Sequence, residues 1–317
     1  MYAPHVTIYF LQGERMNEPA QTMAVAVSAA GLWTSPDAVR PLDAPALSTP
    51  AGLRAWAAAQ GPDERRGLWG RVDSQLLLGE TVLIQEVRDG WARVNAPAQP
   101  SRKDPRGYPG WLPLAQLAEP AEPTGARVVV TEQVTELRDG PDGRIIADDV
   151  SYATVLPARR RQDAFTEVTL PGGRTGWLAD KHLDVHRARG PLPTAAQLVA
   201  AGRQFLGLMY LAGGTHGLML DCSGLPHLIY RRFGHTVPRD ASDLALLGEH
   251  VEVADLAPGD LAVFQNDETG DVYHTGVCTG GGQQVLHVSQ PDWACIDGTL
   301  SERRRRHLVS GRRLRAE

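Results

Sequence analysis

The sequence is short of cysteine, of long apolar runs and of any excess of one charge, and each shortage excludes a class of protein. Its 317 residues include three cysteines without a Cys-x-x-Cys pair, so we expect neither a disulfide framework nor a structural zinc site. No run is long enough to span a bilayer, and the first residues lack the basic region, apolar region and cleavage site of a signal peptide. These absences predict a cytoplasmic protein that needs no metal or other cofactor.

The charges are nearly balanced and mixed along the chain. There are 32 basic and 37 acidic residues, giving a net charge of -5, and no basic face that would attract nucleic acid or an anionic membrane. The one basic cluster, at 303–306, is expected to be a solvated segment near the C-terminus. We therefore expect a monomer whose partner is its substrate, with neither nucleic acid nor membrane as a partner.

A weak internal repeat organises the first part of the chain. GWLPLAQL at 110–117 is echoed by GWLADKHL 66 residues later, and VRDG at 87–90 is echoed by LRDG at 137–140. Each copy contains short alternating runs broken by DG, GG and PG turns, which is typical of a small antiparallel barrel. We predict an N-terminal segment plus a first barrel over 1–120 and a second barrel over 121–187. Within the first unit we expect strands in HVTIYF and MAVAV and a helix in PAGLRAWAAAQ.

A third, α+β domain is predicted over 188–317. It follows a linker rich in glycine and proline, and Thr194 with Gln197 forms a capping-box pattern that opens a helix. The next helix is expected in DCSGLPHLIYRRFG, residues 221–234, whose apolar residues repeat at helical spacing. Strands are expected in DLAVFQ, DVYHTGVCT and QQVLHVSQ.

Cys222 is the first candidate for chemistry. A lone cysteine is more often a small buried residue than a nucleophile. Asp221 is a good N-cap, however, and would place Cys222 in the first helical turn, where backbone N–H groups and the helix dipole favour thiolate. A neighbouring carboxylate raises the pKa of a thiol unless a cation offsets it. We expect Asp221 to serve as a cap, as a binding group for a cation, or as both.

Two histidines supply the rest of a catalytic set. If the TGGG turn is centred between Gly280 and Gly281, His274 and His287 face each other across a hairpin. A cysteine nucleophile, one imidazole as general base and a second group that orients it form the generic triad for acyl transfer. Two alternatives remain open. These are two exposed strand histidines with a core thiol, or a zinc site of the same three residues, which lacks a supporting carboxylate motif.

The third domain resembles the NlpC-type cell-wall peptidases, which are papain-like cysteine peptidases. The likeness rests on YLAGGTHGLMLDCSG, VPRDASDL, LAPGDLAVF and HTGVCTGGGQQVLHVS, and it covers roughly 194–312. The resemblance implies that Cys222 is the nucleophile, His274 the base and His287 its orienting partner. Two departures are Ala212, where the family usually has Trp, and Ala241, where it usually has Ser.

The upstream segments are similar to a narrower subgroup, the gamma-D-glutamyl-L-diamino-acid endopeptidases with two bacterial SH3-type barrels. LWTSPDAVRPLDAPAL, DSQLLLGE and KDPRGYPGWLP carry this likeness. The resemblance implies that the first barrel narrows the active site and that Tyr108, Asp221 and Ser223 bind the free amino terminus of an L-Ala-gamma-D-Glu-diamino-acid peptide. Asp73 is a further candidate for that role, with Glu80 as its rival.

We thus expect a murein-peptide recycling endopeptidase that cuts after gamma-D-Glu through a thioester. One alternative is an exported hydrolase acting on intact peptidoglycan, and another is a non-catalytic wall-binding protein. The sequence leaves open which diamino acid follows D-Glu. His216, Cys278 and Cys295 are expected to have structural roles.

Overall fold

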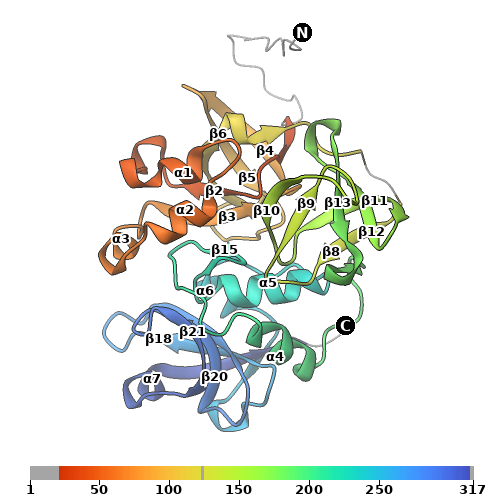
Figure 1. Ribbon diagram of the computed structural model, residues 1–317. Helices are drawn as coiled ribbons and strands as arrows, with labels where there is room; N and C mark the ends of the chain where they lie inside the picture. The colour runs from red at the N-terminus through yellow and green to blue at the C-terminus, as the bar shows by residue number, and fades with distance from the viewer. Residues whose placement is uncertain (1–20, 123–124, 315–317) are drawn as a thin grey trace, which may run out of the picture.

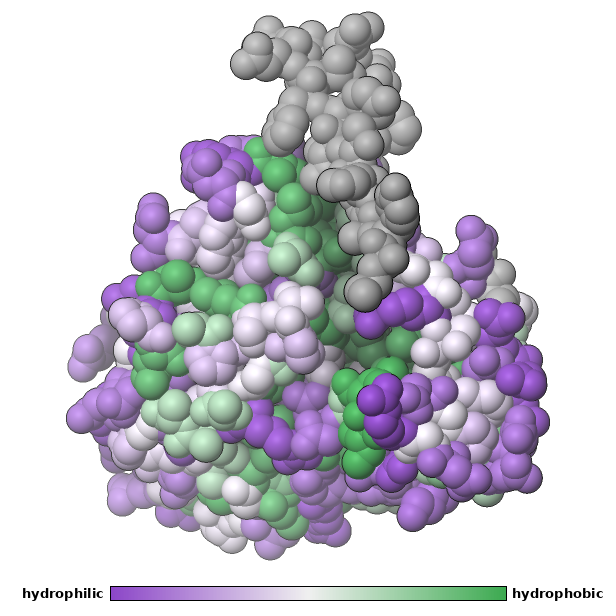
Figure 2. Space-filling model, turned by 45° about the horizontal axis from the view of Figure 1, so that its top comes forward, coloured by the Kyte–Doolittle hydropathy of each residue, from purple (hydrophilic) through white to green (hydrophobic). Residues whose placement is uncertain are grey.

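The computed structural model describes residues 21–122 and 125–314 as two β-rich units followed by a mixed α and β unit (Figure 1). The expected strand HVTIYF lies outside the described residues. Of the helices that are described, none has the length and apolar character needed to cross a membrane. On the face drawn in Figure 2, apolar residues (green) gather in several places, with polar residues (purple) around them.

The first unit is a curled antiparallel sheet with short helices at one side. Its core gathers apolar side chains such as Leu32, Val94 and Leu112. The expected strand MAVAV and the expected helix after Pro50 are present, as β1 and α2. The strands, in spatial order, are β3 (Val72–Leu77), β2 (Ala29–Trp33), β6 (Tyr108–Pro113), β5 (Trp91–Ala96), β4 (Thr81–Arg88), β1 (Thr22–Val25) and β7 (Leu117–Ala118). The helices are α1 (Ala44–Leu47), α2 (Leu53–Ala58) and α3 (Pro62–Arg66).

The second unit repeats the plan of the first. Trp111 on β6 and Trp177 on β13 are the two repeat tryptophans, and each carries an arginine over its ring, Arg88 at 5.0 Å and Arg160 at 5.1 Å from the ring centroid. The strands, in spatial order, are β10 (Ile145–Ser151), β9 (Val134–Arg138), β13 (Thr175–Ala179), β12 (Phe165–Thr169), β11 (Val155–Gln162), β8 (Arg127–Val130) and β14 (Leu183–Val185). The sequence repeat therefore reflects a structural repeat.

The third unit packs helices against an antiparallel sheet. Thr194 and Gln197 form the predicted capping box at the start of α4. The helices are α4 (Ala195–Arg203), α5 (Gly224–Arg232), α6 (Ala241–Leu244) and α7 (Glu302–His307). The main sheet has the order β17 (Glu249–Val251), β22 (Leu308–Arg313), β18 (Leu261–Gln265), β19 (Val272–Cys278), β20 (Gln284–Ser289) and β21 (Ala294–Thr299), and β15 (Thr215–His216) pairs with β16 (Met219–Leu220).

Helix α5 begins later than expected. Its first residue is Gly224 and its N-cap position is Ser223, so Cys222 precedes the helix and does not lie in its first turn. The reason is a side-chain hydrogen bond, because the backbone N–H of Gly224 donates to Oδ1 of Asp221 at 2.7 Å. This bond closes a turn in front of the helix. Asp221 therefore makes a capping hydrogen bond as predicted, from a position two residues before the N-cap Ser223.

The predicted register of the histidine hairpin is wrong by two residues. Strand β19 pairs Val277 with Leu286 and Cys278 with Val285, which puts Gly276, and not His274, opposite His287. The glycine run is a longer loop than expected, closed where the N–H of Thr279 donates to the carbonyl of Gln284 at 3.0 Å. A slip of two residues keeps every side chain on its face of the sheet. The two histidines are therefore still neighbours, along a diagonal.

One buried hydrophobic cluster spans all three units. Trp33 and Trp56 of the first unit, Tyr152 of the second and Phe205 of the third belong to the same buried cluster. Backbone contacts across the boundaries are equally close. A Cβ at Gly213, whose φ is +74°, would lie 2.8 Å from the carbonyl oxygen of Val72 in the first barrel. A Cβ at Gly217 would overlap the carbonyl oxygen of Gln133 in the second barrel. The loop that leads to Cys222 is thus pressed between both barrels.

Candidate active site

Cys222 lies in the turn between β16 and α5, with 8% of its surface exposed. The backbone N–H of Thr275 on β19 donates toward its sulfur. Because Thr275 follows His274 directly, this contact brings the predicted nucleophile to the part of the sheet that carries the predicted base.

The two predicted histidines form a buried pair. Nε2 of His274 lies 2.7 Å from Nδ1 of His287, and the ring centroids are 5.0 Å apart. Gly276 makes this diagonal contact possible, since a Cβ there would lie 2.8 Å from Cβ of His287. With Nε2 of His274 engaged by its partner, Nδ1 is the nitrogen left to accept a proton from the thiol.

The thiol and the imidazoles are neutral at rest. Burial, reinforced by Asp221, raises the pKa of Cys222 to about 12. Burial, with help from the guanidinium of Arg304, lowers the pKa of His274 well below its ordinary value and that of His287 to about 4. The expectation of a resting thiolate is therefore wrong, because the buried position outweighs the turn's backbone donors.

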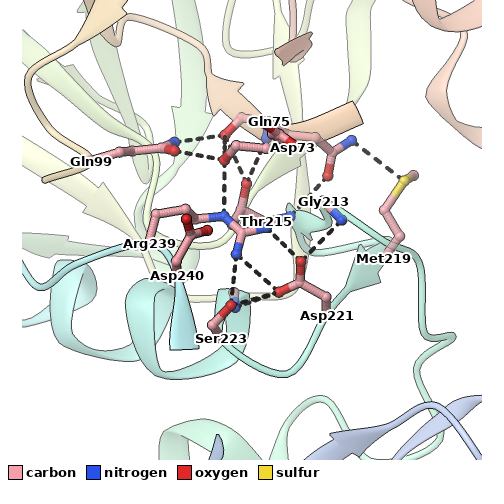
Figure 3. A network of polar contacts seen from close by, with 12 residues as sticks. Asp73, Gln75, Gln99, Gly213, Thr215, Met219, Asp221, Ser223, Arg239 and Asp240 are labelled. Atoms are coloured by element: carbon pink, nitrogen blue, oxygen red, sulfur yellow. Dashed lines mark hydrogen bonds and ion pairs between the residues drawn. The ribbon is translucent and has the colours of Figure 1, made fainter. Parts of the chain in front are cut away.

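Arg239 is the cation beside Asp221. Its Nη2 lies 2.7 Å from Oδ2 and its Nη1 lies 3.0 Å from Oδ1 of that carboxylate, and Nη1 also donates to Oγ of Ser223 at 2.9 Å (Figure 3). Only 1% of Arg239 is exposed, and its Nε donates to Oγ of Ser74 in the first barrel at 2.9 Å. Within the protein, Arg239 is therefore the cation that offsets the charge of Asp221.

Tyr108 lies in a second polar cluster, next to Arg239. Residues of the first barrel form this cluster together with Asp240, the residue that follows Arg239 in the chain. Its hydroxyl donates to Oδ1 of Asp240 at 2.9 Å. Lys103 contacts the same hydroxyl, and its Nζ lies 3.1 Å from Oδ2 of Asp73 and 3.5 Å from Oδ2 of Asp240. Burial, with the charges of Asp240 and Asp73, raises the pKa of Tyr108 above its ordinary value. Sequence reasoning missed Lys103 and Asp240, as it missed Arg239.

The predicted binding residues thus fall into two linked groups. Asp221 and Ser223 surround Arg239, while Tyr108 and Asp73 surround Lys103. The VPRD segment links the two groups, because Arg239 belongs to the first group and the next residue, Asp240, belongs to the second. An arginine and an aspartate side by side within a family motif were the signal that could have revealed it.

Glu80, the rival of Asp73, has a different position. It is 4% exposed, its Oε2 accepts the N–H of Leu77 at 2.7 Å, and its Oε1 pairs with Nη1 of Arg231 on α5 at 3.0 Å. Oε1 therefore joins the first barrel to α5, while Oε2 is held within the barrel. Asp73 is the acid that lies beside Tyr108.

The remaining residues singled out from the sequence are enclosed by protein. His216 is buried, with Nε2 placed 2.9 Å from the carbonyl oxygen of Asp149 and Nδ1 accepting the N–H of Leu218 at 3.1 Å. Cys278 and Cys295 are free and buried. Ala212 lies in the shared core, and Ala241 opens α6. Across 21–122 and 125–314, no group of three or more His, Cys, Asp or Glu side chains could hold a metal ion.

Comparison with known proteins identifies the three units. The model of the NlpC/P60 family matches residues 207–302, that of the bacterial dipeptidyl-peptidase Sh3 domain matches 69–117, and that of the YKFC SH3b2 domain matches 130–186. A gamma-D-glutamyl-L-lysine dipeptidyl-peptidase of Bacillus cereus is 36% identical over 82% of this chain and 80% of its own. The chain belongs to the NlpC/P60 family.

Other relatives agree with this assignment. An enzyme of the same name from Bacillus subtilis is 36% identical over 86% of this chain and 92% of its own. A crystal structure of an NlpC/P60 family protein from Bacillus cereus superimposes with a TM-score of 0.86 at 31% identity, covering 92% of this chain and 99% of that one. The predicted fold class, two SH3-like barrels followed by an NlpC-type domain, is confirmed. This NlpC/P60 protein is a cysteine peptidase. The names of its relatives support a peptidase related to peptidoglycan.

Proposed function

We propose that this peptidase hydrolyses the bond between gamma-D-Glu and the diamino acid of murein peptides that carry a free N-terminal L-Ala. Relatives named for gamma-D-glutamyl-L-lysine bonds support the choice of bond. The observation that carries the proposal is the cluster of Tyr108, Asp73 and Asp240, which joins the neighbourhood of Cys222 through Arg239. These oxygens suit an ammonium group.

The charges around this end of the site favour a cation. Three carboxylates, Asp73, Asp221 and Asp240, face two cations, Arg239 and Lys103, which leaves one negative charge. An ammonium, that of Lys103, already contacts Tyr108 and both carboxylates of its cluster. The amino terminus of a peptide would bring the single positive charge that balances the site.

The chemistry follows from the neutral resting state. Cys222 gives its proton to Nδ1 of His274, and the resulting thiolate attacks the gamma-carbonyl carbon of D-Glu. The N–H of Cys222 and the buried hydroxyl of Tyr210, which lies close enough for the charges of Cys222 and Asp221 to raise its pKa, would stabilise the oxyanion.

His274 then gives the proton to the leaving amine, and the diamino-acid product departs. The gamma-carbonyl of D-Glu stays bound to Cys222 as a thioester. Water hydrolyses that thioester and restores the thiol. His287 holds His274 in place during both steps through the contact of 2.7 Å.

The first barrel limits what may precede L-Ala. Tyr108 is 1% exposed and is held from behind by the barrel core, so it would form the wall at that end of the site. A requirement for a free amine suits soluble peptide fragments better than polymeric murein. We therefore propose a role in recycling murein peptides in the cytoplasm.

The test compares L-Ala-gamma-D-Glu-diamino acid with its N-acetylated form. Acetylation removes the charge that Asp73 and Asp240 would bind, and it should lower kcat/KM by about two orders of magnitude, equivalent to about 2 to 3 kcal/mol. Intact sacculi should be very poor substrates. Efficient cleavage of sacculi would favour the exported wall hydrolase, and no cleavage of any peptide would favour a wall-binding protein.

A further inference from the structure

Arg304 lies next to the base, on α7. Its Nη1 donates to the hydroxyl of Tyr273 at 3.0 Å. Its guanidinium carbon lies 5.4 Å from the ring centroid of Tyr273 and 5.8 Å from that of Phe264. Both rings pack beside His274, with centroid separations of 6.2 and 5.1 Å respectively. The guanidinium therefore belongs to the wall around the base, although it comes from α7.

The positive charge of Arg304 has no carboxylate partner among the described residues. Throughout the described ranges it forms no ion pair, whereas Arg306 of the same helix pairs with Glu302 at 3.5 Å. The side chain is only partly exposed, so water does not fully screen it. Its charge opposes protonation of His274, which the reaction requires. An anion bound to Arg304 would remove that opposition.

The reaction indicates where such an anion would come from. His274 must protonate the leaving amine, so groups beside His274 face the residue that carries this amine. That residue is the diamino acid. Its alpha-carboxylate is attached to the same carbon as the leaving nitrogen, and diaminopimelate carries a second carboxylate at the end of its side chain.

We propose that Arg304 binds a carboxylate of the residue on the leaving side of the cleaved bond and so determines specificity for that residue. This inference rests on the proposed function. The carboxylate has two sources, the alpha-carboxylate of a C-terminal diamino acid or the side-chain carboxylate of diaminopimelate. Arginine suits either, because its planar fork binds a carboxylate through two parallel hydrogen bonds.

The experiment uses four peptides that share L-Ala-gamma-D-Glu. They end in L-Lys, L-Lys amide, meso-diaminopimelate and its alpha-amide. The enzymes are the wild type, Arg304→Gln, Arg304→Lys and, as a matched control from the same helix, Arg303→Gln.

Loss of the carboxylate that Arg304 binds, or of the guanidinium, should each lower kcat/KM by about tenfold or more, and the two losses together should cost no more than one. If the alpha-carboxylate is bound, Lys peptide and Lys amide should differ in the wild type and become alike in Arg304→Gln. If the side-chain carboxylate is bound, the diaminopimelate peptides should be preferred to the Lys peptides in the wild type only. Arg304→Lys should retain part of either preference, and Arg303→Gln all of it.

Equal losses on all four peptides in Arg304→Gln, with the wild-type preferences intact, would overturn the inference, because they would indicate a structural role. Unchanged kinetics would overturn it too. A second readout is the acid limb of the kcat/KM profile. Removing Arg304 should shift it to higher pH, since the base loses a neighbouring cation. The N-acetyl comparison keeps the two proposals apart, because Arg304→Gln should leave the preference for a free amine unchanged.

Discussion

The guanidinium of Arg239 and the carboxylate of Asp221 form a buried ion pair through two contacts, of 2.7 and 3.0 Å. Arg239 also reaches Ser74 on β3. The residue before the nucleophile is therefore fixed to the first barrel through a single side chain. Breaking a buried pair by removing one partner is costly, because the other charge stays buried and unpaired.

Arg239→Met should accordingly lower the free energy of unfolding by about 3 to 5 kcal/mol, as measured by urea denaturation. The double variant with Asp221→Asn should recover part of this loss, because no lone charge remains. If Arg239→Met alone were as stable as the wild type, the result would contradict a stabilising ion pair between Arg239 and Asp221.

Cys222 should be the only thiol that iodoacetamide modifies quickly. Cys278 and Cys295 are 0% and 1% exposed and lack a base, whereas Cys222 is 8% exposed beside the histidine pair. Since the pKa of Cys222 is raised to about 12, its alkylation rate should keep rising above pH 8. Mass spectrometry of labelled peptides measures this rate. A flat profile from acidic pH upward would indicate a resting thiolate, and early labelling of Cys278 would count against the assignment of the nucleophile.

His274→Ala should abolish turnover, while His287→Asn should leave measurable activity. A base is indispensable, but its orienting partner can be another hydrogen-bonding side chain of suitable reach. Steady-state kinetics on the free tripeptide distinguishes the two variants. Equal and complete losses, together with inhibition by a chelator, would instead favour shared metal ligation.

Lys103→Met should bind free-amine peptides more tightly, with KM lowered about threefold to tenfold at low salt. Removing the ammonium leaves Asp73 and Asp240 without their cation and frees the place beside Tyr108. Arg106→Met is the matched control, since Arg106 lies in the same loop and pairs with Asp104. A raised KM would mean that Lys103 helps to hold the substrate and does not compete with it.

The protein should lose stability as the pH falls below about 6.5. Burial lowers the pKa of His216 to about 4 and that of His227 to about 3, so below pH 6.5 the unfolded chain binds more protons than the folded one. His216→Gln should flatten the fall in unfolding free energy between pH 6 and 5 by about 1.2 kcal/mol per pH unit. An unchanged slope would show that His216 does not stay neutral in the folded protein.

The sequence predicted those parts of the site that depend on local pattern. Cys222 and both histidines stand in short motifs, and the histidine pair was found despite a wrong register, because a slip of two residues keeps the face. The length of a glycine-rich loop is not encoded in its composition, which is why the register itself failed.

The parts that the sequence did not predict depend on contacts between distant segments. Tyr108 and Asp240 are 132 positions apart and meet only where the first barrel packs on the third unit. Ser74 and Arg239 are separated by 165 positions. Neither pairing leaves a local trace. The resting charge of Cys222 was also missed, because burial is a property of the assembled fold.

Gly213 and Gly217 have a consequence for how such a chain can change over evolution. At each of these positions the loop before Cys222 lies so close to the backbone of a barrel that there is no room for a Cβ atom. Many proteins acquire binding modules by gene fusion, with a linker that tolerates any neighbour. Here an exchanged barrel would have to reproduce the backbone path at Val72 or Gln133 to within a fraction of an ångström. Replacing one barrel alone should therefore disturb the loop that leads to Cys222.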